Sequence, residues 1–374
     1  MNATCVERVT ALRERVADAA PVNETQRALA PALVDALADA GLLRALMPRS
    51  FGGLGATLTD FVAALELLAA EDASTAWCVC QGAVIGTTSL WLPEDSIRRI
   101  WDDPRAAVAN GPPMDAVAHV DGSGYRVTGR WGFSSGCQHA TWMQGACRVV
   151  GGGRWGVAFF PKESVTLHDT WQVQGLRGTG SFEFSVSDQR VDADWFADMR
   201  RAPASDETLY RVPTGLVFAV SFAGVALGVA RRGLDVAFEL ARDKHPKYAS
   251  GALKDDPDAQ RELGTAEARW RSARAYLHAT IAEVLERVGQ AAVISTDDRI
   301  ALRLAGTHVM REAAAVFDAA YRVAGASGIY LDHPLQRPFQ DMHVITQHVQ
   351  ARVGHYAYAG RYLLGDAFVP GPLN

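Results

Sequence analysis

Apolar residues recur every three or four positions in the N-terminal part of the chain, residues 1–103, which predicts a helical region. Within it, the spacing of Leu29, Leu33 and Leu37 predicts a helix, and Asn23 fits the first position of its capping box. Gly41 is suited to end this helix, because glycine adopts the left-handed conformation common at helix C-termini. A further helix, buried and rich in small apolar residues, is expected over residues 73–90.

The same spacing returns after residue 198 in segments long enough for the helices of a bundle. Four helices are expected there, at residues 216–242, 260–288, 297–324 and 334–364. The segment 212–230 carries no charge and approaches the length of a membrane-spanning helix. Its small residues and its amphipathic continuation favour a helix buried inside a protein bundle. The polar loop 245–258 is too long for a simple turn between bundle helices, so a mobile or functional loop is expected.

Residues 104–198 lose the helical spacing and show short runs of β-branched and aromatic residues instead. Asp121-Gly122 lies between two such runs and predicts a β-hairpin. Further strands are expected at 143–150, 155–160, 165–168 and 182–186. The expected fold class is therefore α+β. Its three domains are N-terminal helical (1–103), central β (104–198) and C-terminal four-helix bundle (199–374).

The composition is that of a soluble globular enzyme, with 48% hydrophobic and 21% charged residues among 374. A net charge of −5 gives no electrostatic sign of a nucleic-acid partner. The five cysteines lack any Cys-x-x-Cys spacing, so neither a disulfide scaffold nor a metal site is expected. The charged N-terminus has no apolar signal core, and a cytoplasmic location without membrane attachment is expected.

Two stretches in the β region carry side chains that suit a ligand. Residues 131–142 combine two indoles, an imidazole, small hydroxyls and glycines, and residues 171–181 contain Gly-Leu-Arg-Gly-Thr-Gly-Ser. Aromatic walls with a few hydroxyls suit a flat, partly polar ligand. Each stretch alone could be a well-packed turn, but together they are expected to form two sides of one site.

Over nearly its whole length the chain resembles the acyl-CoA dehydrogenase superfold. The matching motifs are Pro48-Arg49-Ser50-Phe51-Gly52-Gly53, Gly129-Arg130-Trp131-Gly132-Phe133-Ser134-Ser135-Gly136, Gly178-Thr179-Gly180-Ser181, Tyr321-Arg322-Val323-Ala324-Gly325-Ala326-Ser327 and Pro334-Leu335-Gln336-Arg337. The resemblance implies that the central domain is β-barrel-like.

Within this superfold the chain is more similar to the group D flavin-dependent monooxygenases, such as p-hydroxyphenylacetate hydroxylase oxygenase components and dibenzothiophene monooxygenases. Dehydrogenases usually carry a glutamate base in a Tyr-Glu-Gly-Thr motif, but here Gln347-His348-Val349-Gln350 takes its place. Monooxygenases of this branch place a histidine in this region. The alternatives are a dehydrogenase with a displaced base, an N-oxygenase of an amino sugar, and a scaffold without flavin.

The resemblance implies a chemistry for these residues. Reduced flavin (FMNH2 or FADH2) takes up O2 to form a C4a-hydroperoxide, which persists only where water is excluded. Ser135, or Ser134 beside it, would supply a neutral hydroxyl at the flavin N5. His348 would bond to the hydroperoxide or the substrate as a proton donor or base. Asn110 would lie against the peroxide as a third catalytic residue.

The remaining site residues follow from the same resemblance. Flavin contacts are expected from Trp131, Phe133, Trp171, Gly178, Thr179, Gly180, Ser181 and Arg337, and substrate contacts from Trp77, His139 and Met114. The substrate would be an aromatic or natural-product-like small molecule. No Gly-x-Gly-x-x-Gly follows a strand, so a separate NAD(P)H:flavin reductase is expected to supply the flavin. A homotetramer is also implied.

Overall fold

A computed structural model describes residues 3–247, 251–291, 293–369 and 371. It confirms an α+β chain, in which helices precede and follow a β-sheet. The chain forms two compact units: residues 1–61, 77–173 and 177–214 make the first unit, and residues 62–76, 174–176 and 215–374 make the second. The three predicted domain ranges stay a prediction.

The helices of the first unit include the three N-terminal ones and a later short helix. These are α1 (Cys5–Thr10), α2 (Arg13–Gln26), α3 (Pro31–Asp39) and α6 (Glu94–Trp101), while α4 (Leu58–Glu71) and α5 (Ala73–Gly86) each contribute residues to both units. Gly41 has φ +71°, as expected for the end of a helix. The expected cap at Asn23 is wrong, because Asn23 lies inside α2 and its side-chain oxygen accepts the Ala30 N–H at 2.8 Å.

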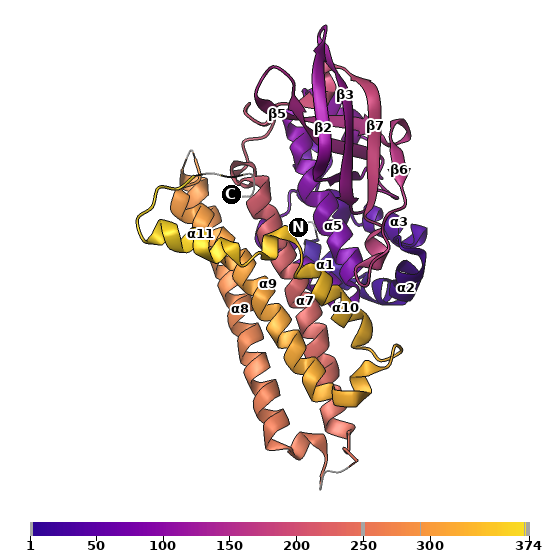
Figure 1. Ribbon diagram of the computed structural model, residues 1–374, viewed down its shortest axis with the longest axis vertical. Coiled ribbons are helices and arrows are strands. Elements are labelled where there is room, and N and C mark those ends of the chain that lie inside the picture. The colour runs from indigo at the N-terminus through magenta and orange to yellow at the C-terminus, as the bar shows by residue number, and fades with distance from the viewer. Residues whose placement is uncertain (1–2, 248–250, 292, 370, 372–374) are drawn as a thin grey trace. The chain divides into compact units, whose positions relative to one another are not determined.

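The first unit also contains the sheet (Figure 1). Its strands are β1 (Val108–Gly111), β2 (Pro113–Asp121), β3 (Gly124–Ser134), β4 (Trp142–Val149), β5 (Arg154–Pro161), β6 (Thr166–His168), β7 (Phe182–Val191) and β8 (Phe196–Ala197). The strand order is β6-β7-β3-β2-β4-β5-β8, with β1 paired to β4. The strands β1 and β2 run parallel to β4, and the other pairs are antiparallel. The predicted hairpin at Asp121-Gly122 joins β2 to β3.

Trp131 is the centre of the sheet's apolar core. Its indole is completely buried, stacks on Phe184 with ring centroids 4.7 Å apart, and donates to the Ala146 carbonyl at 2.9 Å. The indole also passes so close to Gly145 that a Cβ there would lie 2.4 Å from Trp131 Cε2. A glycine is therefore required on β4 to seat the largest side chain of this core.

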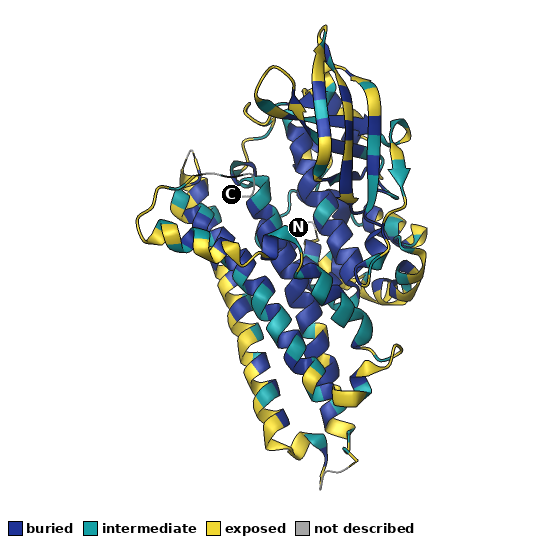
Figure 2. Ribbon diagram, in the orientation of Figure 1, coloured by how far each residue is buried: buried dark blue, intermediate teal, exposed yellow. Residues whose placement is uncertain are grey.

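The second unit contains three long helices, α7 (Thr214–Asp243), α8 (Pro257–Gln290) and α9 (Thr296–Ala324). Figure 2 shows that α7 is buried over most of its length, whereas one face of α8 is exposed. By length and composition α7 could cross a membrane, but 78% of its most apolar window is buried inside the protein. The predicted loop 245–258 includes residues 248–250, which lie outside the described residues.

The single helix expected over residues 334–364 is wrong. The segment forms α10 (Gln336–Ile345), a short 3-10 turn at Val349–Ala351 and α11 (Gly354–Leu363). The break comes at His348, whose ψ of 146° is extended. Its side chain accepts the Gln350 N–H, as an N-cap does, and so starts the short turn.

Candidate functional site

Ser135 is at the centre of a cluster of buried hydroxyl groups in the first unit. Its Oγ lies 2.7 Å from Ser181 Oγ and accepts a hydrogen bond from Trp77 Nε1 at 3.2 Å. Thr179 Oγ1 extends the cluster, 2.6 Å from Ser181 Oγ. We call Ser135, Thr179 and Ser181 the hydroxyl cluster. It joins the two stretches that the sequence analysis expected to form one site.

The backbone also ties these two stretches together. The Gly136 N–H donates to the Thr179 carbonyl at 2.9 Å. Gly180 has φ +50°, and a Cβ there would lie 2.4 Å from Gln138 Nε2. Only glycine fits this position, because both the conformation and the space exclude a side chain. Gly178, beside Thr179, is buried in the same turn.

Phe133 and Trp171 form an aromatic corner next to the hydroxyl cluster in sequence. The register between β3 and β7 shifts between Trp131 and Ser134, and Phe133 has φ +56°. A bulky residue with a left-handed backbone is strained, and such strain often lies at functional sites. The Phe133 side chain is 67% exposed and meets the Trp171 ring edge-on, with centroids 6.0 Å apart.

Ser134 differs from Ser135 in its surroundings. Ser134 Oγ is buried and has no hydrogen-bond partner within the described residues. A buried hydroxyl without a partner is costly, and a bound ligand or water is a usual explanation. Neutral hydroxyls on Ser134 and Ser135, which directly follow the exposed Phe133 in the sequence, are donors that suit the polar edge of an isoalloxazine ring, and the aromatic side chain suits its flat face. The residues present therefore fit a flavin.

Trp131, which was expected to contact the flavin, is instead fully enclosed in the sheet core. From there the indole supports β3, and a direct flavin contact stays a prediction.

Asn110 lies on β1 and accepts a hydrogen bond from Gln81 Nε2 of α5 at 2.5 Å. It also pairs in register with Gln144 of β4, whose Oε1 is buried and lacks a partner within the described residues. Sequence reasoning proposed Asn110 but missed both glutamines, because no local spacing connects them. Met114, on β2, is 63% exposed.

His139 packs against the turn between β3 and β4. A Cβ on Gly136 would lie 3.0 Å from the His139 ring. Burial, aided by the Lys162 charge, lowers the pKa of His139 to about 4. The imidazole is therefore neutral at pH 7 and is suited to packing or hydrogen bonding.

His348 lies in the second unit, between α10 and the short turn. Its Nδ1 accepts the Gln350 N–H at 3.4 Å, and its ring meets the Phe222 ring edge-on at 4.8 Å. Burial lowers the pKa of His348 to about 4, so the ring is neutral at pH 7. Since Nδ1 accepts a hydrogen bond, Nε2 carries the proton of the neutral ring.

A buried polar network holds the turn that follows His348. The Gln350 side chain accepts a hydrogen bond from the Arg303 guanidinium and donates to the Gly215 carbonyl at 3.1 Å. Thr307 Oγ1 donates to the Gln350 carbonyl at 3.1 Å and lies 2.9 Å from His355 Nδ1. Burial lowers the pKa of Arg303 to about 10, which still leaves it charged at pH 7. Sequence reasoning missed this network, because its members come from three separate helical segments and the turn.

Two further charged residues of the second unit bond to backbone groups of the same unit. Arg337 Nη2 donates to the Glu71 carbonyl at 3.3 Å. Asp341 is the one acidic residue between positions 336 and 363 of the sequence, and its Oδ1 accepts the Leu176 N–H at 2.6 Å. The carboxylate of this segment is thus engaged in holding the backbone. Among the described residues no group of His, Cys, Asp and Glu side chains is arranged to hold a metal ion.

The chain is similar to known proteins over most of its length. Residues 7–92 match the acyl-CoA dehydrogenase N-terminal domain, and residues 220–353 match the acyl-CoA dehydrogenase C-terminal domain. An indole-3-acetate monooxygenase of Pseudomonas putida is 32% identical over 97% of this chain and 95% of its own length. The flavin-dependent monooxygenase, oxygenase subunit HsaA, of Mycobacterium tuberculosis is 26% identical, over 90% of this chain and 89% of its own.

A solved structure shows the same fold. The crystal structure of 3-HSA hydroxylase from Rhodococcus sp. RHA1 superposes with a TM-score of 0.92 over 100% of both chains, at 22% identity. At that identity the likeness concerns the fold alone.

Proposed function

We propose a function from the premise that this chain belongs to the acyl-CoA dehydrogenase family, and to the flavin-dependent monooxygenases within it. It is an oxygenase component, which uses reduced flavin and O2 to oxygenate an aromatic small molecule, and a separate reductase supplies the flavin. The single observation that carries this function is the full-length similarity at 32% identity to an enzyme of that class.

The flavin ring is proposed to lie against the hydroxyl cluster and the corner of Phe133 and Trp171. When bound, reduced flavin supplies the two electrons that split O2, so that one oxygen atom enters the substrate and the other leaves as water. Ser135 would hold a ring nitrogen through a neutral hydroxyl, already oriented by Ser181 and Trp77. The buried surroundings of these groups would exclude water from the reacting atoms.

His348 is proposed to act as a neutral hydrogen-bond donor through Nε2. With its pKa lowered to about 4, the ring cannot deliver a proton as imidazolium at pH 7. A donor of this kind orients an oxygen atom of a ligand without adding charge to the site. The network of Arg303, Gln350 and Thr307 would keep the ring in place, since it fixes the backbone N–H that Nδ1 accepts.

The substrate is proposed to be an indole or a similar fused aromatic compound, as the name of the 32% identical relative suggests. Gln81, Asn110 and Gln144 would offer neutral amide groups to a polar atom of such a ring. Each amide offers one acceptor oxygen and two N–H donors, so these groups can bind either a ring N–H or an acidic side group of such a compound. The cofactor is reduced flavin, FMNH2 or FADH2, and a cytoplasmic location remains a prediction.

A homotetramer is proposed for the assembled enzyme. The second unit exposes a run of large apolar side chains at Ile329, Tyr330 and Leu331, and another pair at Leu363 and Leu364. Exposed apolar groups of this size favour association with another subunit. Light scattering at micromolar concentration tests this, and a monomer would contradict it.

The experiment that tests the proposed function supplies photoreduced FMN or FAD anaerobically, with no reductase, and then admits O2 together with an indole substrate. We expect an oxygenated product to form, at a yield of at most one equivalent per equivalent of reduced flavin. The protein alone should not oxidise NADH or NADPH. Rapid NAD(P)H oxidation without a reductase would contradict the two-component assignment.

A further inference from the structure

A cavity of about 230 Å³ lies in the first unit, apart from the residues of the candidate functional site. It is lined by residues of α6, β4, β5, β7 and the short turn before β8, among them Arg99, Trp142, Arg190 and Trp195. Neither the hydroxyl cluster nor the aromatic corner contributes to its lining. Trp142 ends the stretch 131–142, which was expected to form one side of the ligand site. In the structure its side chain lines this cavity instead.

The wall of the cavity is aromatic. Trp142 and Trp195 stack with ring centroids 4.6 Å apart and an angle of 19° between the rings. Both indoles remain partly exposed, and Phe159 and Phe160 line the same space. Sites for drug-sized ligands are about 300–1,000 Å³. The smaller volume here suits a molecule with one or two rings.

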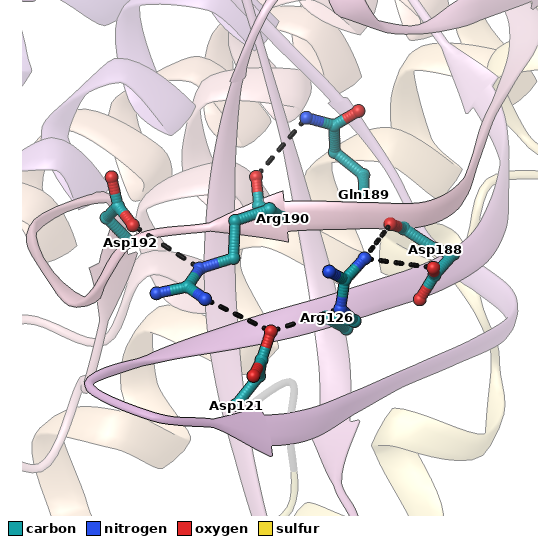
Figure 3. A network of polar contacts seen from close by, with 6 residues as sticks. All are labelled: Asp121, Arg126, Asp188, Gln189, Arg190 and Asp192. Carbon is teal, nitrogen blue, oxygen red and sulfur yellow. Dashed lines mark hydrogen bonds and ion pairs between the residues drawn. The ribbon is translucent and has the colours of Figure 1, made fainter.

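The cavity also carries a positive charge that the protein does not neutralise. Arg190 is neutralised, because it pairs with Asp121 at 3.0 Å and with Asp192 at 3.4 Å (Figure 3). Arg99 differs, because its side chain makes a cation–π contact, in which Cζ lies 5.7 Å from the centroid of the Trp195 ring. The Arg99 residue is exposed, and its guanidinium makes no hydrogen bond or ion pair with the part of the chain that the structure describes.

A guanidinium held over an indole by a cation–π contact forms no hydrogen bond to the ring plane, so its N–H groups stay available for another partner. Those groups match a carboxylate, which two parallel N–H donors can bind together. The neighbouring Arg98 has no such capacity to spare, because it already pairs with Glu94 at 2.6 Å. The guanidinium of Arg99, which has no protein partner among the described residues, lies at the aromatic wall and therefore favours an aromatic anion.

We propose that this cavity is a second binding site, for a small aromatic carboxylate, with the ring packed against Trp142 and Trp195 and the carboxylate bound by Arg99. The inference does not rest on the proposed function.

The test uses the full-length, flavin-free protein with phenylacetate as the probe and phenylacetamide as its neutral counterpart. Binding is followed by calorimetry and by ¹⁹F NMR of fluorotryptophan-labelled protein, in which Trp142→Phe and Trp195→Phe assign the two resonances. We expect phenylacetate to shift both resonances and phenylacetamide to bind about tenfold or more weakly, as a charge-assisted hydrogen bond predicts.

The matched variants are Arg99→Gln and Arg98→Gln. Arg99→Gln should weaken phenylacetate binding at this site about ten- to a hundredfold. Arg98→Gln, one residue away, should leave it unchanged, and unaltered urea midpoints would show that both variants are folded. Shifts confined to other tryptophans, equal affinity for the amide, equal losses in both variants, or no binding at millimolar phenylacetate would each overturn the proposal.

Discussion

The two adjacent serines at the end of β3 should respond oppositely to the same substitution. Ser135 Oγ takes part in two hydrogen bonds, with Ser181 and Trp77, whereas Ser134 Oγ is buried without a partner among the described residues. Ser135→Ala and Ser134→Ala remove the same atom from neighbouring positions. Each is thus a control for the other.

The magnitudes follow from these contacts. A typical hydrogen bond contributes about 0.5–1.5 kcal/mol net, so Ser135→Ala should lower the free energy of unfolding by about 1–3 kcal/mol. Ser134→Ala removes a buried hydroxyl that has no such bond, so it should change the free energy of unfolding by less than about 0.5 kcal/mol or raise it slightly. Urea unfolding of the flavin-free variants, with equal slopes, measures both values.

Catalysis should separate the two variants again. Ser135→Ala should uncouple the enzyme, so that O2 consumption continues while a larger share appears as H2O2 and a smaller share as product. Ser134→Ala should stay near wild-type coupling. If Ser134→Ala were the uncoupled variant and Ser135→Ala were coupled, the flavin hydroxyl would be Ser134, and the role assigned to Ser135 would be refuted.

Further predictions concern the second unit, the sheet core and acid stability. His348→Ala should keep reduced-flavin binding while product formation falls about a hundredfold to a thousandfold, because a positioned hydrogen-bond donor is lost, as stopped-flow mixing can measure; normal turnover would remove His348 from the mechanism. Gln350→Leu should lower turnover less than His348→Ala does. It should also change the ¹⁵N shifts of His348, because the turn after His348 loses the side-chain hydrogen bonds to Arg303 and Gly215; unchanged shifts would contradict the positioning role. Gly145→Ala should cost about 1–3 kcal/mol in urea unfolding, because the added methyl meets Trp131; wild-type stability would show that the core can adjust. His139, His348 and His355 have folded pKa values of about 4, below the unfolded value of about 6.5. Between these values the unfolded chain binds more protons, so the free energy of unfolding should fall with decreasing pH by up to about 1.4 kcal/mol per pH unit for each group; equal urea midpoints at pH 7 and pH 4.5 would contradict the shifts.

The sequence predicted the long helices well because their signal is local and repeated. The helix expected at 216–242 is observed at Thr214–Asp243, and the one expected at 297–324 is observed at Thr296–Ala324. The break at His348 was missed, because a histidine side chain that caps a 3-10 turn leaves no trace in apolar spacing. Asn23 failed for a similar reason, since an amide can accept a backbone N–H seven residues away as readily as it can cap a helix.

The meeting of the two predicted stretches is observed, whereas the roles of the individual site residues stay predictions. The presence of hydroxyls and indoles in two stretches suggested that both belong to one site, and the bond between Ser135 and Ser181 brings them together. Trp131 is buried in the sheet core, whereas Trp142 lines a separate cavity. This difference could not be predicted, because residue type does not say which face of a strand is buried. The ties of Gln350 to Arg303 and Thr307 span more than forty residues, and no motif connects such positions.

The central claim is that this chain transfers oxygen from O2 to an aromatic substrate with reduced flavin supplied from outside. The most direct measurement is a single-turnover reaction with photoreduced flavin, ¹⁸O2 and indole-3-acetate, followed by mass spectrometry of the product. One ¹⁸O atom in the product, formed without reductase or NAD(P)H, is the predicted result. Absence of ¹⁸O from every product, together with flavin reduction by an acyl-CoA thioester, would contradict the claim and indicate a dehydrogenase instead.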